Sequence, residues 1–219
     1  MLEKLERMDA FFAARLDEYE EHMLRNTAGV AEGYVELAKY VPKKTQTLLD
    51  LGCGTGLELE EIFKVCPRAH VTGIDLAQVM LDRLYAKHSD KRIHLICASY
   101  LGYDFGAEAY DAAVSFETMH HLSHDEKRSL YRNIFHALKR GGKYIEGDYM
   151  AKTQEEEDRL FAENRRIRAS QNIADGELYH YDTPCTAENQ IKLFLQAGFA
   201  RAEKVWRKGA TTIIVAEKL

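Results

Sequence analysis

The chain has 219 residues, of which 46% are hydrophobic and 30% are charged, and its formal net charge is −5. This length predicts a single soluble domain that buries a sizeable core without disulfide or metal crosslinks. The acidic balance argues against DNA or RNA as the main partner, because a nucleic-acid backbone is bound by an excess of Lys and Arg.

The composition and the sequence pattern also indicate where in the cell the protein is expected. Four cysteines without a CxxC pair argue against a disulfide framework or a zinc knuckle. The charged N-terminal stretch lacks the pattern of a signal peptide, and no apolar run has the length needed to cross a bilayer. We therefore expect a cytoplasmic protein without a membrane partner. Nothing in the sequence indicates an oligomeric state.

Short apolar runs alternate with amphipathic stretches along the chain, a pattern typical of an α/β fold with a parallel sheet. Ser123 and Thr153 each stand three residues before a Glu, which predicts two capping boxes at helix starts. In chain order we expect helices at 2–24 and 30–40, a strand at 47–51, a helix at 57–65, a strand at 70–74, a helix at 79–88, strands at 92–97 and 112–116, a helix from 123 to the glycines at 141–142, a strand at 143–147, helices at 153–171 and 186–197, and a hairpin of strands at 202–206 and 211–217.

The first expected strand runs directly into a glycine-rich turn, Gly52, Gly54 and Gly56, and then into a helix. Glycines there permit positive φ and leave no Cβ between the backbone and a ligand. Asp50 stands at the strand end, and Asp75 ends the next strand, where an acid can accept both hydroxyls of a ribose. Nicotinamide dinucleotide sites have the spacing GxGxxG, so the spacing GxGxG disfavours an oxidoreductase.

The stretch DLGCGTG at 50–56 resembles the first motif of class I S-adenosylmethionine-dependent methyltransferases. IDLAQVM at 74–80, YDAAVSF at 110–116, LKRGGK at 138–143 and QAGF at 196–199 are similar to later segments of that family, although Arg140 stands where the family usually has proline. The resemblance implies a Rossmann-like, doubly wound sheet of seven mostly parallel strands, with a C-terminal antiparallel hairpin and helices on both faces. It also implies S-adenosylmethionine as cofactor and S-adenosylhomocysteine as product.

The resemblance further implies where the cofactor binds. The glycine turn would approach its amino-acid and ribose parts, Asp75 would bind the ribose hydroxyls, and Leu76 and Met80 would flank the adenine. Ser99 stands where the family often has an acid, so the adenine contact is weaker here. Tyr19 either covers the carboxylate end of the cofactor or packs its helix onto the sheet edge. The implied cofactor-binding residues are Tyr19, Asp50, Gly52, Cys53, Gly54, Gly56, Asp75, Leu76, Met80, Ser99, Tyr100 and Phe116.

Methyl transfer by in-line displacement mainly needs alignment, and a base is needed only where the acceptor must lose a proton. His121 follows the fourth strand and is the candidate base; Asp148, at the end of the fifth, is the candidate to orient the acceptor. The alternatives are a histidine that braces its loop and a carboxylate that caps a helix. The candidate substrate contacts are His120, Tyr149, Tyr179 and Tyr181, with His180 between the last two; for 179–181, aromatic packing is the alternative.

We expect no metal site, because His120, His121 and His124 have no carboxylate clearly placed as a third ligand. The single domain would span 1–219, with an N-terminal helical cap at 1–42 and an inserted substrate lid at 150–185. The prediction is a methyltransferase that acts on a small molecule. The alternatives are a methyltransferase that acts on protein or RNA, and a noncatalytic sensor of the cofactor. The acceptor atom stays open among N, O, S and C.

Overall fold

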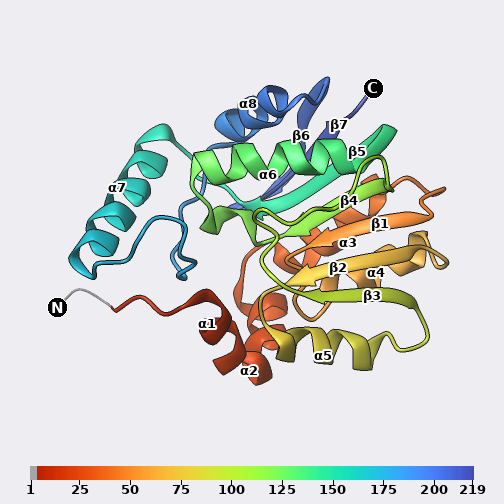
Figure 1. Cartoon of the computed structure of the whole chain (residues 1–219), viewed down its shortest axis with the longest axis horizontal. Helices are drawn as coiled ribbons and strands as arrows, with labels where there is room; N and C mark the ends of the chain where they lie inside the picture. Colours follow the sequence, from red (N-terminus) through yellow and green to blue (C-terminus); the bar gives the residue numbers. More distant parts are fainter. Residues whose placement is uncertain (1–3) are drawn as a thin grey trace.

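The computed structural model describes residues 4–219, in which seven strands form one sheet (Figure 1). The strands are β1 (Thr47–Leu51), β2 (His70–Asp75), β3 (Arg92–Cys97), β4 (Tyr110–Phe116), β5 (Leu138–Tyr149), β6 (Arg201–Lys208) and β7 (Thr211–Glu217). Their order across the sheet is β3-β2-β1-β4-β5-β7-β6. The first five strands pair in parallel, and β7 is antiparallel to both β5 and β6. The expected fold class, including the C-terminal hairpin, is therefore confirmed.

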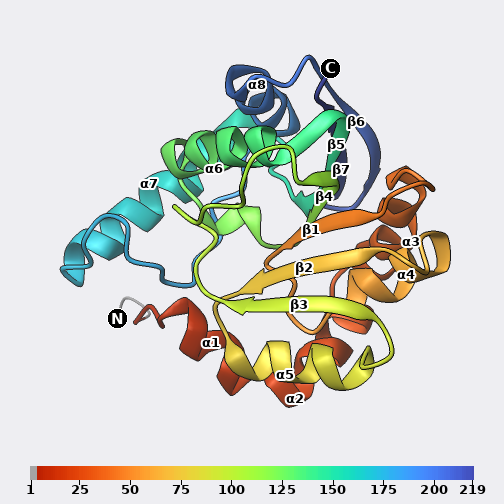
Figure 2. The same cartoon turned by 45° about the vertical axis from the view of Figure 1, so that its right-hand side comes forward.

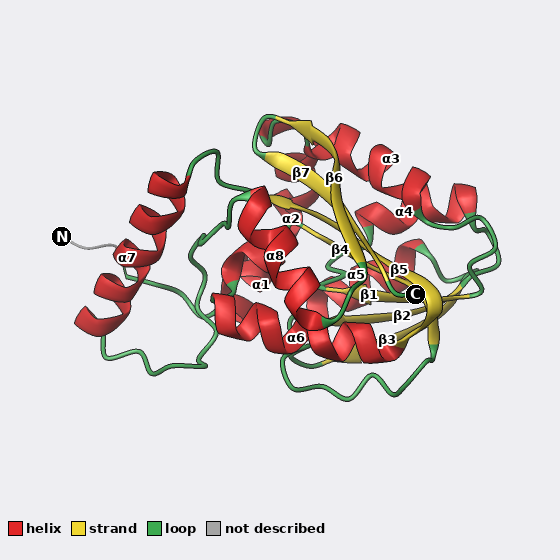
Figure 3. Cartoon of the chain, turned by 90° about the horizontal axis from the view of Figure 1, so that it is seen from above, coloured by secondary structure: helices red, strands yellow, loops and turns green. Residues whose placement is uncertain are grey.

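Helices cover both faces of this sheet, as two turned views show (Figures 2 and 3). One core packs β1, β2, β4 and β7 against α3 (Val30–Tyr40), α4 (Leu57–Val65) and α5 (Gln78–Lys87). The other core packs the opposite face against α6 (His124–Ala137) and α8 (Ala187–Ala197). Three further helical segments lie at the carboxyl ends of the strands or beyond them: α1 (Met8–Ala14), α2 (Leu16–Glu21) and α7 (Gln154–Ser170), the last standing apart from the sheet in Figure 3.

The N-terminal helix differs from the expected span of 2–24. Its expected start at Leu2 lies outside the described residues, and helix begins only at Met8. It breaks at Arg15, whose guanidinium donates hydrogen bonds to the Phe11 carbonyl and to the Glu6 carboxylate. After α2 the chain continues as a short π-helix, His22–Asn26. The N-terminal segment is thus a series of short helices, and its backbone also pairs with a distant part of the chain. Hydrophobic periodicity alone reveals neither the breaks nor the pairing.

The helix that begins after Ser123 is shorter than expected. Ser123 and Glu126 form the predicted capping box. The helix ends at Ala137, because Leu138 is already extended and begins β5 beside Tyr110. The glycine pair therefore lies within β5 at a register shift, not at a helix end. At Thr153 only half of the box forms, since the Glu156 carboxylate accepts from the Lys152 N–H instead. Within the described range, no helix is both long and apolar enough to span a bilayer.

Candidate functional site

The glycine turn after β1 brings bare backbone to the carboxyl end of the sheet. Gly52 and Gly54 have φ of 69° and 47°, a region that favours glycine. A Cβ on Gly52 would lie 2.5 Å from the Thr118 hydroxyl, so that turn is closed against the loop after β4. A Cβ on Gly54 would meet the Tyr19 hydroxyl first, at 3.6 Å. The Tyr19 hydroxyl therefore lies close to the turn, while its side chain also packs against one of the two cores, so both interpretations of Tyr19 stay open.

Asp75 ends β2 beside this turn. One carboxylate oxygen accepts the Gly54 N–H at 3.0 Å and the other accepts the Ala77 N–H at 2.9 Å. These bonds fix the carboxylate, and each oxygen keeps acceptor capacity for a further donor. Burial raises the pKa of Asp75 despite the two backbone donors.

Two further acids, Asp50 and Glu58, lie close to each other near the turn. Asp50 is fully buried, and neither of its carboxylate oxygens has a hydrogen-bond partner among residues 4–219. The carboxyl of Glu58 lies beside it, and burial raises the pKa of both groups, that of Glu58 to about 7. A cationic ligand nearby would favour the charged forms of these two acids, because it would supply the counter-charge that their buried surroundings lack. S-adenosylmethionine has a sulfonium and an ammonium group, so this chemistry fits it.

Two cavities meet above these residues. The larger, of about 690 Å³, is built from five separate segments of the chain. The smaller, of about 40 Å³, is lined by Gly52, Asp75, Leu76 and Tyr100 and is covered by α1 and by Leu178. Phe12 and His121 line both cavities and form the wall between them. The lining of the larger cavity comprises Phe11, Phe12, Arg15, Glu18, Tyr19, His22, Met23, Thr27, Ala28, Glu117, His120, His121, Tyr149, His180, Asp182, Ala210 and Thr211.

A cluster of histidines and acids forms one side of the larger cavity. His120 Nδ1 lies 2.6 Å from Asp148 Oδ1, and both side chains are buried. Burial alone would lower the pKa of His120, but Asp148, Asp182 and Glu117 outweigh it and raise that pKa to about 9. Burial and the neighbouring His120 lower the pKa of His121 well below its ordinary value. Two adjacent imidazoles therefore have opposite electrostatic environments.

Some of the residues that we predicted to bind the cofactor line one of these cavities, and others do not. Gly52, Asp75, Leu76 and Tyr100 line the smaller cavity. The buried residues Cys53, Met80 and Phe116 line neither cavity. Phe116 packs on Tyr34 with ring centroids 4.3 Å apart, on the opposite face of the sheet from the smaller cavity. Gly56 forms the left-handed start of α4, and the Ser99 hydroxyl accepts the Leu101 N–H.

On the acceptor side, His120 and Tyr149 line the larger cavity, as expected of substrate contacts. Asp148 pairs with His120 rather than with His121. Tyr179 forms an isolated bridge with Arg7 and lines none of these cavities. Tyr181 lines a different depression, next to the N-terminal segment.

Glu117 and Asp182 were missed by the sequence reasoning, which found no carboxylate as a third ligand for the histidines. That interpretation is corrected here: Glu117, Asp148 and Asp182 each bring an oxygen within 4.0 Å of a His120 nitrogen. The position of Glu117 directly after β4 was a usable signal, since ligands bind at the carboxyl ends of strands. Asp182 had no such signal, because it is brought in by a loop 60 residues further along the chain.

Residues 48–142 match a family model described as “Methyltransferase domain”. Among curated proteins, a malonyl-(acyl-carrier protein) O-methyltransferase of Bacillus anthracis is 27% identical over 135 residues, covering 62% of this chain and 48% of the relative. Phosphoethanolamine N-methyltransferase 2 of Caenorhabditis elegans is 34% identical over 125 residues, covering 52% of this chain and 27% of the relative. The chain thus spans about half the length of the first and about a quarter of the second.

Among solved structures, an O-methyltransferase family protein from Burkholderia thailandensis superposes with a TM-score of 0.71. The alignment covers 97% of this chain and 63% of that chain at 16% identity. At this identity the likeness concerns the fold alone. The family match covers the glycine turn, Asp75 and the histidine pair, and it leaves out both the N-terminal cap and the segment at 150–185.

Proposed function

Because the chain belongs to the class I S-adenosylmethionine-dependent methyltransferases, we propose that it is an enzyme that methylates a small molecule. The observation that carries this proposal is the wall formed by Phe12 and His121, which separates the space beside Asp75 from the larger cavity. A ligand held at Asp75 and a ligand held in the larger cavity would meet when a shift of α1 moves Phe12 out of that wall. Such an arrangement serves group transfer, because it holds two reactants next to each other.

The chain's own groups around the turn suit the cofactor. When bound, S-adenosylmethionine supplies a methyl group on a sulfonium, which is already a good leaving group. The Asp75 carboxylate, fixed by two backbone N–H groups, would accept the ribose hydroxyls. The bare backbone at Gly54 would admit the amino-acid portion below Tyr19, and Asp50 and Glu58 would compensate its positive charge. The smaller cavity holds about one water molecule, so α1 must shift to admit the cofactor.

On the acceptor side, His121 is the proposed proton acceptor because it lies on the shared wall. Asp148 is a positioning residue in this scheme, since it holds the ring of His120. Tyr149 would contact the acceptor from the end of β5. The volume of the larger cavity lies within the range of about 300–1,000 Å³ that is common for small-molecule sites, which favours a small acceptor over protein or RNA.

The N-terminal cap and the inserted segment would act together as a lid. The Met8 N–H donates to the Leu178 carbonyl at 3.0 Å, and the His180 N–H donates to the Glu6 carbonyl at 2.9 Å. These bonds join residues 6–8 to 178–180 across the carboxyl end of the sheet. We propose that this clasp excludes water during transfer.

We also propose a reducing, cytoplasmic location, which is supported by four cysteines that are all unpaired.

Incubation of the protein with methyl-labelled S-adenosylmethionine and a metabolite extract tests the proposal. We expect the label to appear in the small-molecule fraction, and a matched reaction with Asp75→Ala should give only background. Label confined to protein or RNA would refute the small acceptor. Tight cofactor binding by calorimetry, with no transfer to any fraction, would favour a sensor instead.

A further inference from the structure

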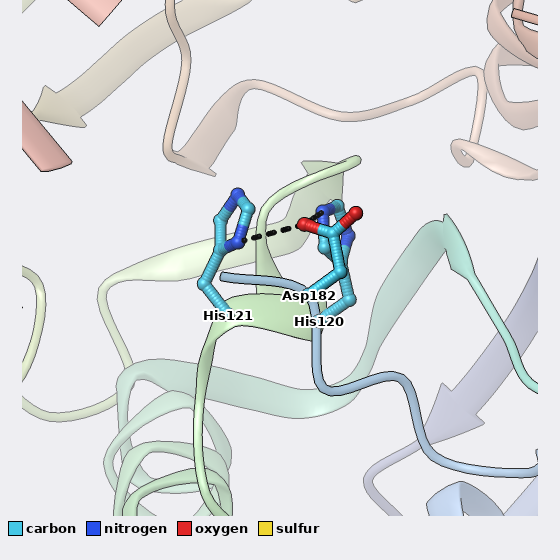
Figure 4. Close-up of side chains that lie close together, drawn as sticks. All are labelled: His120, His121 and Asp182. Carbon is cyan, nitrogen blue, oxygen red and sulfur yellow. Dashed lines mark ion pairs between the residues drawn. The ribbon is translucent and has the colours of Figure 1, made fainter. Parts of the chain in front are cut away.

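We propose that His120, His121 and Asp182 bind a divalent transition-metal ion at the side of the larger cavity (Figure 4). Asp182 Oδ1 lies 3.6 Å from His120 Nε2 and 3.5 Å from His121 Nδ1. One ligand atom from each residue lies within 4.8 Å of the other two. In a tetrahedral zinc site with bonds of about 2.1 Å, neighbouring ligand atoms are about 3.4 Å apart. The two separations from Asp182 are close to this value, and an ion would take the place of the 3.4 Å contact between His121 Nδ1 and the Tyr181 carbonyl.

The Asp182 oxygen is the second observation. Oδ1 is buried, yet it has no hydrogen-bond partner within the described part of the chain. The two histidine nitrogens nearest to it stand at or beyond the limit of a hydrogen bond. The Asp182 side chain is 43% exposed, so its outer oxygen can be solvated, whereas Oδ1 faces only the imidazoles of His120, His121 and His180. A cation bound between Oδ1 and the first two rings would supply the partner that this oxygen lacks.

The surroundings of His120 have the arrangement that metal-binding histidines need. Its Nδ1 faces the buried Asp148 carboxylate at 2.6 Å and can keep its proton there, whereas an ion bound at Nε2, on the side of Asp182, would displace the proton from that nitrogen. A carboxylate that accepts from the far nitrogen of a ligand histidine fixes the ring and strengthens the ligand. A histidine that only braces a loop would not need a buried carboxylate on its far nitrogen.

The backbone also holds Asp182 against the histidine pair. The N–H and the hydroxyl of Thr183 both donate to the His120 carbonyl, at 2.7 Å and 3.1 Å. The loop at 180–183 is therefore attached to the short helix Met119–His121 next to the proposed ligands. The three ligands come from two segments about 60 residues apart, but this attachment limits their relative movement. A preformed site binds an ion without first ordering its ligands.

The remaining coordination positions would face the cavity or His180. His180 Nε2 lies 4.0 Å from Asp182 Oδ1, and its ring stacks on Phe11 with centroids 3.5 Å apart. An ion with one open position could bind an acceptor oxygen, nitrogen or sulfur and lower its pKa as a Lewis acid. With the ion bound, His121 would no longer serve as the proton acceptor proposed above, and the proton released by the acceptor would pass to solvent. This last step rests on the proposed function; binding of the ion does not.

Metal titration of the full-length chain, freed of metal and without cofactor, tests the site. We expect about one Zn²⁺ per chain by calorimetry, and visible absorption bands when Co²⁺ is added instead. Asp182→Asn and His121→Gln should each weaken Zn²⁺ binding by at least about tenfold. The exposed controls His94→Gln and Asp175→Asn should bind as the wild type does, and circular dichroism checks that every variant is folded.

Three outcomes would overturn the proposal. The first is no uptake of either ion by the wild type. The second is uptake that folded Asp182→Asn and His121→Gln leave unchanged. The third is uptake that is lost in Glu157→Gln instead, since His124, Glu157 and Cys185 form a separate group of ligand atoms. Cofactor binding, measured separately, would be unaffected by these results, so a failure of the metal site and a failure of the methyltransferase proposal are distinguishable.

Discussion

The cofactor side and the acceptor side of the cavity pair are built in different ways. On the cofactor side, the glycine turn and Asp75 come from one β1-α4-β2 unit, and backbone bonds join them directly. On the acceptor side, the lining residues come from α1 and α2, the loop after β4, the end of β5, the loop at 180–182 and the start of β7. The cofactor side is therefore formed by residues that are close in sequence. The acceptor side forms only when segments that are distant in sequence fold together. Variants on the two sides should therefore fail differently.

Asp75→Ala should have the largest effect, because it removes the carboxylate that two backbone N–H groups hold at the end of β2. Loss of two charge-assisted hydrogen bonds to the ribose should weaken cofactor binding by about 100-fold or more, as measured by calorimetry. Asp82→Ala, on the exposed side of α5, is the matched control and should bind normally. An unchanged cofactor affinity in Asp75→Ala would contradict the proposal that Asp75 binds the ribose hydroxyls. It would also contradict the view that the cofactor site is built from one β1-α4-β2 unit.

Asp148→Asn tests the acceptor side at a residue that does not contact the proposed ion but holds the ring of its ligand His120. The weaker acceptor should lower Zn²⁺ affinity by about 10–100-fold while cofactor affinity stays unchanged. Asp90→Asn, which is exposed, serves as control. Because Asp148 is buried, thermal unfolding must accompany the titration. A folded variant with normal Zn²⁺ affinity would mean that His120 does not depend on this carboxylate.

Tyr19→Phe asks whether the N-terminal cap takes part in cofactor binding. The substitution removes only the hydroxyl that lies above Gly54, so cofactor affinity should fall about threefold to tenfold. The control is Tyr85→Phe, since that ring is 60% exposed on α5. Equal affinity of the variant and the wild type would assign Tyr19 to packing alone, which is the other interpretation of its position.

The smallest expected effect concerns the pH dependence of stability at the base of the inserted segment. Burial raises the pKa of Glu157, but hydrogen bonds from His124, the Thr186 N–H and Asn189 outweigh it and lower the pKa to about 2. Hydrogen bonds with Cys185 and Glu157 raise the pKa of His124 to about 9. The Glu157 contribution is thus present above its ordinary pKa of 4.5 and is lost as the pH falls through about 2. The His124 contribution is present below 6.5 and is lost as the pH rises through about 9.

Urea unfolding of the wild type and Glu157→Gln across this range checks the pair. The difference in unfolding free energy should be largest between about pH 4.5 and 6.5, at about 1–2 kcal/mol, and should narrow on both sides. Glu155→Gln, exposed on the same helix, is the control. A difference that is constant with pH would show that this ion pair does not secure the segment.

The contrast between the cofactor side and the acceptor side also explains which parts of the structure could be predicted from the sequence. The α3 to α5 helices, the Ser123 cap and the strands other than β5 are encoded by local periodicity and capping residues, and they form close to the expected positions, whereas β5 begins five residues earlier than expected. The glycine turn and Asp75 could be identified because they are adjacent to those elements. Phe116 was misplaced, since its ring packs across the sheet on Tyr34. Asp182 could not be found, because no local pattern states which loop reaches His120.

The clasp between residues 6–8 and 178–180 has a kinetic consequence. The larger cavity is bounded by the same α1 that covers the small space beside Asp75. A spent cofactor beside Asp75 would lie under α1 and Leu178, so we expect it to leave only when the paired backbones separate. Opening of the clasp, rather than the chemical step, would then set the turnover rate.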